Sequence, residues 1–203
     1  MKIAVFVSGG GTNLQAIIDN IKDGILKDIE IVLVLSSSKD AYALERAADN
    51  GIKSTVVSRK DFDSIEAWDE KVVSEVEKSG AELVVLAGYL SLLGPKIVSK
   101  YSNRIINIHP ALIPSFCGSG MYGIRPHKAA LAKGVKVSGA TVHFVNENYD
   151  EGPILLQKAV DVLPDDTPET LQKRIMQECE WKILPQAIRL IADGKVVIEN
   201  NIC

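Results

Sequence analysis

Short runs of β-branched and aliphatic residues alternate with amphipathic segments in the first half of this sequence, and this alternation restricts the fold more than any other feature. Strands are expected at residues 2–7, 29–35, 53–57, 82–88 and 104–109. Helices are expected at 13–21, from about residue 41, at 64–79 and at 94–100. Strands that alternate with helices form parallel sheets covered on both faces. The sequence therefore predicts an α/β fold with a single doubly wound, mostly parallel, Rossmann-like sheet.

The second half of the chain follows a different pattern. A long loop over residues 110–123 precedes a short helix near 127–132, and two strands are expected at 136–147 and 153–162. The turn between these strands is short and acidic and contains Gly152, so the strands are expected to pair antiparallel. This pair is predicted as an antiparallel C-terminal addition to the sheet.

A long helix is predicted over residues 165–194. Thr167 is a candidate N-cap, Pro168 would occupy the first helical position, and Gly194 would end the helix. Pro185 lies inside this segment and is expected to kink it, because proline lacks the N–H that a helix interior uses.

The composition predicts one globular domain that spans residues 1–203. With 46% hydrophobic and 24% charged residues, the chain has enough apolar material for a core and is not typical of disordered proteins. The net charge is −3 and the basic residues are scattered, so nucleic acid is not an expected partner. The apolar run at residues 3–7 is too short for a signal peptide or a membrane span. Three cysteines without metal-ligand spacing predict free thiols, no metal site and a cytoplasmic protein.

Residues 8–18, SGGGTNLQAII, place a glycine cluster between the first strand and the first helix. Glycines let backbone N–H groups approach a ligand closely, and the field at a helix N-terminus favours an anion. Leu14 occupies the place of the third glycine of a dinucleotide fingerprint, and GxxxxGK[ST] is absent, so neither NAD nor ATP is indicated. A single phosphate group on a small molecule is predicted here, with a ligand-free tight turn as the alternative.

Two polar residues interrupt the hydrophobic strand IINIHP at residues 105–110. Side chains alternate along a strand, so Asn107 and His109 point to the same face. A buried polar group left unpaired costs about 1–3 kcal/mol, so a structural core alone would rarely place both here. An amide N–H suits a developing oxyanion and an imidazole suits proton transfer at neutral pH. The pair indicates a transfer through a tetrahedral intermediate.

A histidine in this role gains from a nearby carboxylate that favours its charged form. Residues 146–153, NENYDEGP, offer Glu147, Asp150 and Glu151, and the spacing does not decide among them. His127 and His143 are interpreted as structural or supporting residues. Cys117, in the loop after Pro114, is interpreted as a small apolar filler.

Several longer motifs now form a recognisable set. They are SGGGTNLQAII, VVLAGYLSLL, NIHPALIPSF, GATVHFVNENYDEGPILLQ, and ECEWKILP followed by ADGK. Together they resemble the folate-dependent formyltransferases over nearly the whole chain. The SGGGTN loop is similar to that of the short glycinamide ribonucleotide formyltransferases of purine biosynthesis.

The resemblance implies transfer of a formyl group from 10-formyltetrahydrofolate to the amine of glycinamide ribonucleotide, with no metal. It implies that Asp150 raises the pKa of the catalytic histidine. The implied catalytic residues are Asn107, His109 and Asp150. The implied ribonucleotide-binding residues are Gly11, Thr12 and Asn13 for the phosphate and Glu180 for the ribose. The implied folate-binding residues are Leu90, Ser91, Leu92, Leu93 and Asn107.

Glu180 has some support from the residues themselves. Met176, Glu180 and Leu184 would share one helix face, which makes Glu180 an acid among apolar neighbours, and a half-buried acid needs partners. A salt-bridged surface residue is the alternative. Ser91 and Ile65 stand where some family members have arginines for the glutamate tail of folate, so recognition of this tail stays open.

Other functions remain as alternatives at this point. Within the superfamily they are a formyltetrahydrofolate hydrolase, which usually carries an extra N-terminal domain, and a methionyl-tRNA or sugar formyltransferase. From a different class, a non-catalytic phosphosugar-binding module would keep the glycine loop but would gain nothing from Asn107 and His109. A homodimer and the conformation of the loop at 115–126 also stay open.

Overall fold

The computed structural model describes residues 1–203. Two compact units divide the chain, Met1–Ile106 and Asn107–Cys203. The single domain expected over residues 1–203 stays a prediction. No helix is both long and apolar enough to cross a membrane.

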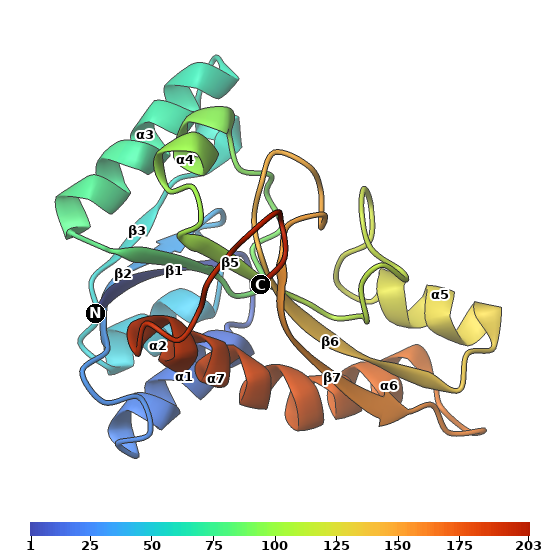
Figure 1. The fold of residues 1–203 in the computed structure, drawn as a ribbon. Helices are drawn as coiled ribbons and strands as arrows, with labels where there is room; N and C mark the ends of the chain where they lie inside the picture. The colour runs from blue at the N-terminus through green and yellow to red at the C-terminus, as the bar shows by residue number, and fades with distance from the viewer. The chain divides into compact units, whose positions relative to one another are not determined.

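The first unit is a parallel sheet with helices between its strands. Its strands are β1 (Lys2–Val7), β2 (Glu30–Ser36), β3 (Ser54–Val56) and β4 (Leu83–Leu86), all paired in parallel in the order β3-β2-β1-β4. Its helices are α1 (Thr12–Lys22), α2 (Ala43–Asp49), α3 (Ile65–Ser79) and α4 (Pro95–Lys100), with a 3₁₀ turn at Arg59–Asp61. Helices α1 and α2 lie on one side of these strands, and α3 and α4 lie on the other (Figure 1). The strands and helices expected in this half are therefore present.

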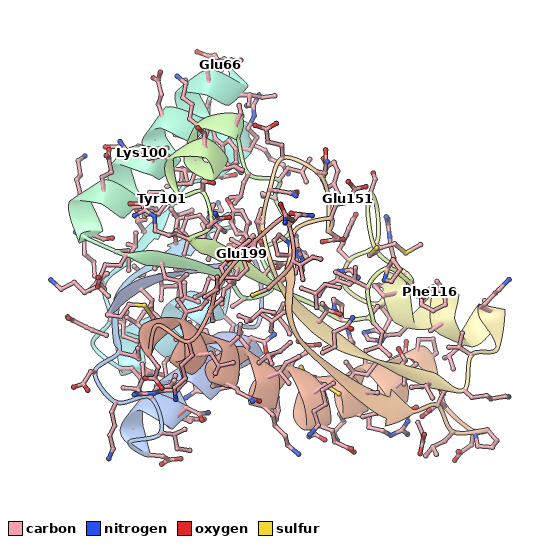
Figure 2. All side chains as sticks on the ribbon, in the orientation of Figure 1. Glu66, Lys100, Tyr101, Phe116, Glu151 and Glu199 are labelled. Carbon is pink, nitrogen blue, oxygen red and sulfur yellow. The ribbon has the colours of Figure 1, made fainter.

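The start of α4 is fixed by a buried carboxylate. Asp69 of α3 is fully buried, and it accepts the backbone N–H groups of Lys96 at 2.7 Å and Ile97 at 3.2 Å. These N–H groups belong to the first helical turn and have no partner within the helix. At the other end of α4, Lys100 pairs with Glu77 of α3. Lys100 is labelled in Figure 2. The segment before α4, which contains residues 90–93, is thereby held at its carboxyl end.

The second unit contains the remaining strands and helices. Strand β5 (Ile105–His109) begins at the end of the first unit, and β6 (Val137–Phe144) pairs antiparallel with β7 (Ile154–Asp161). The seven strands form one sheet in the order β3-β2-β1-β4-β5-β6-β7. The predicted mostly parallel sheet with an antiparallel C-terminal addition is confirmed. Helix α5 (Arg125–Lys133) covers the short helix that was expected near residue 127.

The C-terminal helix has a break that the sequence did not predict. It consists of α6 (Pro168–Ile175), a π-helical turn (Met176–Glu180) and α7 (Trp181–Ala192). Thr167 is the N-cap, as predicted, and forms a capping box with Thr170. Pro185 lies within α7, and the departure from α-helical geometry occupies the turn before Trp181. Such π turns occur frequently at functional sites.

Candidate active site

The glycine turn, residues 8–13, connects β1 to α1 within the first unit. Gly11 has a left-handed backbone, with φ of 69°, and its carbonyl accepts the N–H of Gln15 as α1 begins. The carbonyl of Gly9 accepts the N–H of Ala43 at 3.0 Å, and Arg46 donates to the carbonyl of Gly10 at 2.8 Å. Helix α2 therefore holds the glycine turn through hydrogen bonds to the carbonyl groups of Gly9 and Gly10.

The glycines of this turn have different physical explanations. A Cβ on Gly11 would lie 2.6 Å from the Cβ of Ala43, so packing alone requires glycine there. A Cβ on Gly9 or Gly10 would meet no atom within 4 Å. Packing within the protein does not explain these two glycines, which favours close approach of a ligand to their backbone.

Gly11→Ala is expected to destabilise the protein by about 2 kcal/mol, because alanine is strained in the left-handed region and would press against Ala43. Gly9→Ala is the matched control, with open space at its Cβ and no positive φ. Urea unfolding of both variants measures the difference in the free energy of unfolding. Equal stabilities would contradict the packing account of Gly11.

The segment Leu90–Leu93 lies beside the glycine turn in the first unit. The backbone N–H of Leu90 donates to the hydroxyl of Ser8 at 2.8 Å, and this hydroxyl also contacts that of Ser37 at 2.6 Å. The side chains of Leu90 and Leu92 are 55% and 59% exposed. They are not packed into the core, which favours a ligand-facing role over the structural alternative.

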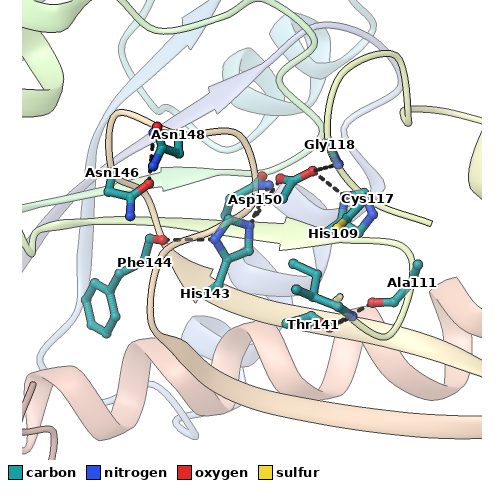
Figure 3. A network of polar contacts seen from close by, with 12 residues as sticks. His109, Ala111, Cys117, Gly118, Thr141, His143, Phe144, Asn146, Asn148 and Asp150 are labelled. Carbon is teal, nitrogen blue, oxygen red and sulfur yellow. Dashed lines mark hydrogen bonds and ion pairs between the residues drawn. The ribbon is translucent and has the colours of Figure 1, made fainter. Parts of the chain in front are cut away.

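A network of polar side chains lies at the start of the second unit (Figure 3). His109 Nδ1 is 3.6 Å from a carboxylate oxygen of Asp150, and His143 Nε2 is 3.4 Å from the other. Asn107 Nδ2 is 3.2 Å from His143 Nε2. The three residues predicted as catalytic, Asn107, His109 and Asp150, are therefore brought into one network, with His143 as a fourth member.

The structure decides which acid of the 146–153 turn meets the histidines. Asp150 faces His109 and His143 and accepts the backbone N–H of Gly118 at 2.8 Å. Glu147 and Glu151 are exposed and make no contact with these histidines. Asp150 has a positive φ of 54°, which is uncommon for a residue other than glycine and is typical of sites where geometry matters.

The protonation of His109 reflects two opposing effects. Burial lowers its pKa, and this effect is larger than the rise caused by the Asp150 carboxylate and by the hydrogen bond to the Phe116 carbonyl. The nearby His143 lowers the pKa further. Asp150 thus acts on the pKa of His109 in the expected direction, and burial acts against it.

The tautomer of His109 follows from its contacts. Nε2 lies 2.9 Å from the carbonyl oxygen of Phe116, and a carbonyl can only accept, so Nε2 carries a proton. Nδ1 faces Asp150. Phe116 has a positive φ of 53°, so the loop after Pro114 adopts an unusual backbone where it contacts His109.

Asp150 itself is kept ionised. Burial acts to raise its pKa, but the neighbouring His143, the Gly118 N–H and His109 together lower it below its ordinary value. A carboxylate that is charged at neutral pH is therefore available to a protonated His109.

His127 of α5 is fully buried, and neither of its ring nitrogens has a hydrogen-bond partner. Burial and the proximity of His109 lower its pKa to about 4. The unfolded chain, with a histidine pKa of about 6.5, therefore binds more protons than the folded protein between these values, so stability falls as the pH falls.

Between pH 7 and pH 4.5, His127 is expected to remove about 2 kcal/mol from the free energy of unfolding. Phenylalanine cannot take up a proton. The free energy of unfolding of His127→Phe should therefore fall by about 2 kcal/mol less than that of the unsubstituted protein between pH 7 and pH 4.5. Urea unfolding of both proteins at a series of pH values measures this difference. Parallel pH dependences would contradict the assignment of a neutral, buried His127.

Glu180 lies at the end of the π-helical turn and is 8% exposed. The π turn interrupts the regular helical spacing that was expected for Met176, Glu180 and Leu184. The expected burial of the acid is nevertheless present. Glu180 belongs to the second unit and the glycine turn to the first.

Cys117 fits the unreactive interpretation. Its thiol donates to the carbonyl of Pro114 at 3.2 Å, and burial together with the charge of Asp150 raises its pKa. All three cysteines are free, as predicted.

The place of His143 in the network was not predicted from the sequence. The available signal was the same as for Asn107 and His109, since Thr141 and His143 interrupt the buried strand β6 two residues apart. Thr141 accepts the N–H of Ile113 at 3.1 Å and donates to the carbonyl of Ala111 at 2.7 Å, so it holds the chain just after β5.

An α/β sheet that carries an amide, an imidazole and a carboxylate in one network defines an enzyme with an acid–base site. The chain belongs to the formyl transferase family, which matches residues 1–188.

Named relatives refine this assignment. The chain is 42% identical over 198 residues to the chloroplastic phosphoribosylglycinamide formyltransferase of Arabidopsis thaliana, covering 96% of this chain and 66% of the relative. It is 38% identical to the phosphoribosylglycinamide formyltransferase of Escherichia coli, covering 99% of this chain and 92% of that enzyme. The chain spans only 14% of a trifunctional purine biosynthetic protein of Chironomus tentans, to which it is 42% identical over 98% of this chain.

Solved structures give the same family. Glycinamide ribonucleotide transformylase 1 from Symbiobacterium toebii is 43% identical, with a TM-score of 0.93 over 100% of this chain and 92% of that one. A formyltetrahydrofolate deformylase from Pseudomonas syringae is 27% identical, with a TM-score of 0.88 over 99% of this chain and 64% of that one. The fold is thus shared by transferases and a deformylase.

Proposed function

We propose that this protein transfers the formyl group of 10-formyltetrahydrofolate to the amine of glycinamide ribonucleotide. The products are formylglycinamide ribonucleotide and tetrahydrofolate, in purine biosynthesis. The observation that carries the proposal is the network of Asn107, His109 and Asp150, because it provides an oxyanion donor, a proton carrier and a charge that supports this carrier. The similarity to enzymes named for this reaction supports the choice of substrates.

The reaction is a direct transfer. The substrate amine forms a bond to the formyl carbon, and the carbonyl oxygen becomes an anion that an N–H of Asn107 stabilises. The carbon–nitrogen bond to folate then breaks, and the proton lost by the amine passes to the departing folate nitrogen through His109. Two substrates held side by side also react as though at a high effective concentration.

His109 is suited to carry this proton in both directions. Its lowered pKa favours the neutral ring before reaction, which is the form that can accept the amine proton. The charged form that results has Asp150 beside Nδ1. Because Nδ1 faces Asp150, Nε2 is the nitrogen that meets substrate. When substrate binds, the contact of Nε2 with the Phe116 carbonyl opens and the ring proton moves to Nδ1 beside Asp150, so Nε2 is free to accept the amine proton.

The remaining predicted residues would bind the substrates. In this proposal Gly11, Thr12 and Asn13 hold the phosphate, and the exposed backbone of Gly9 and Gly10 supports close approach of an anion. Glu180 would accept hydrogen bonds from the ribose hydroxyls. Folate would bind along Leu90, Ser91, Leu92, Leu93 and Asn107.

The partners in this proposal are small molecules. A homodimer and a cytoplasmic location are further expectations from the sequence, and the three free cysteines suit a reducing compartment. Light scattering at micromolar concentration would test for the dimer.

A formyltetrahydrofolate hydrolase is the second candidate, because the deformylase from Pseudomonas syringae shares this fold. In that reaction water replaces the amine as nucleophile, and the same three residues would serve.

One assay separates the candidates. The protein is mixed with 10-formyltetrahydrofolate, and folate release is followed with and without glycinamide ribonucleotide. Release that depends on the ribonucleotide supports the transferase. Equal release without it would favour the hydrolase, and no release in either mixture would favour the binding module.

A further inference from the structure

His143 lies where β6 leaves regular pairing. It is 2% exposed, and the register between β6 and β7 shifts between Val142 and His143. Such irregularities re-aim a side chain and are common beside active sites. The shift lies at the residue whose ring contacts Asn107. The same ring contacts Asp150 (Figure 3).

The tautomer of His143 follows from its neighbours. Nδ1 is 2.9 Å from the carbonyl oxygen of Phe144, which can only accept, so Nδ1 carries a proton. In the neutral ring Nε2 is then an acceptor. The group within 3.2 Å of Nε2 that can donate to it is the Nδ2 amide of Asn107.

We propose that His143 is a positioning residue that orients the Asn107 carboxamide for catalysis. By accepting one N–H of Asn107 Nδ2, it fixes the plane of the amide and leaves the other N–H for the oxygen that becomes negative. Without this contact the amide can rotate, and its oxygen can take the place of the N–H donor. This inference rests on the proposed formyl transfer and adds a specific role to that site.

Asp150 provides the rival explanation. Its Oδ1 lies 3.4 Å from His143 Nε2, and in the rival explanation His143 holds this carboxylate instead of the amide. A neutral Nε2 has no proton to give to Asp150, however, so in this tautomer the contact with Asn107 is the hydrogen bond. The two explanations predict different kcat values when His143→Asn is combined with a substitution of Asn107 or of Asp150.

Two conservative substitutions separate the two ring nitrogens. In His143→Gln the side-chain oxygen reaches the position of Nε2 and can accept from Asn107. In His143→Asn the side chain can still donate to the Phe144 carbonyl but is too short to reach Asn107. We expect His143→Asn to lower kcat about 10²-fold, as a misplaced catalytic group does, and His143→Gln to stay within about fivefold of the unchanged protein. The KM for the ribonucleotide should change little in either.

The Asn107→Ala background identifies the residue through which His143 acts. If His143 works through Asn107, adding His143→Asn to Asn107→Ala should lower kcat by less than about twofold, because the oriented group is already absent. In the Asp150→Asn background the loss from His143→Asn should persist. The reverse pattern, with the loss retained without Asn107 and absent without Asp150, would overturn the proposal in favour of the rival.

A spectrum tests the geometry independently of activity. Long-range ¹H–¹⁵N spectra of protein labelled at histidine should show that the neutral ring of His143 is protonated at Nδ1 and unprotonated at Nε2. The opposite tautomer would overturn the proposal even if the His143→Asn variant fails to fold. Thermal unfolding of each variant identifies such a failure.

These outcomes are distinct from failure of the proposed function. If the unchanged protein releases no folate in the presence of the ribonucleotide, the transferase itself is refuted. If the unchanged protein is active but the Asn and Gln variants lose kcat equally, only the role of His143 is refuted.

Discussion

His109→Ala is expected to lower turnover by about 10²- to 10⁴-fold, the range that proton transfer by a positioned side chain contributes. The effect should fall on kcat, because His109 acts on the proton that moves in the transition state. Binding of the ribonucleotide should stay nearly unchanged, since the phosphate and ribose are assigned to other residues. Steady-state kinetics and calorimetric titration measure the two quantities.

The fold of this variant needs its own control, because His109 is 3% exposed. His109→Gln keeps an amide N–H that can donate to the Phe116 carbonyl but cannot carry a proton near neutral pH. It should retain the stability of the unchanged protein and still lose turnover. Turnover within about threefold of normal in both variants would refute the role of His109.

Asp150→Asn is expected to lower kcat about 10²-fold at pH 7.5, the lower end of the range for acid–base catalysis. The Asp150 carboxylate raises the pKa of His109, so its removal lowers this pKa further and leaves less of the charged form that gives the proton to folate. The side-chain oxygen of asparagine can still accept the N–H of Gly118, so the loop contact is kept.

The loss of kcat in Asp150→Asn should depend on pH with a definite sign. Lowering the pH restores the charged form of His109 in Asp150→Asn, so the deficit in kcat relative to the unchanged protein should shrink as the pH falls from 8 towards 6. Glu151→Gln is the matched control, since this neighbouring acid is exposed. It should leave kcat near normal. A deficit that stays constant with pH would show that Asp150 acts through something other than the pKa of His109.

Local patterns in the sequence predicted most of the secondary structure. The 3.6-residue period of residues 64–79 gave α3, and Ser64 caps it by accepting the N–H of Ala67. Thr167 and Pro168 marked the start of α6. These signals are local, because a helix and its caps depend on residues within a few positions of one another.

The π-helical turn at Met176–Glu180 had no such signal. Its residues fit an ordinary helix, although the turn is π-helical in the structure. Pro185 marked this helix as irregular but not the position of the irregularity.

The sequence by itself determined the alternating strands and helices and the presence of two polar side chains, Asn107 and His109, at the end of a buried strand. Only the tertiary structure selected Asp150 over Glu147 and Glu151 and brought His143 against Asn107, because the meeting of side chains distant in the chain depends on how loops and strands pack. The direction of the His109 pKa shift also depends on the tertiary structure. Burial and a nearby carboxylate oppose each other, and their balance depends on everything packed around the ring.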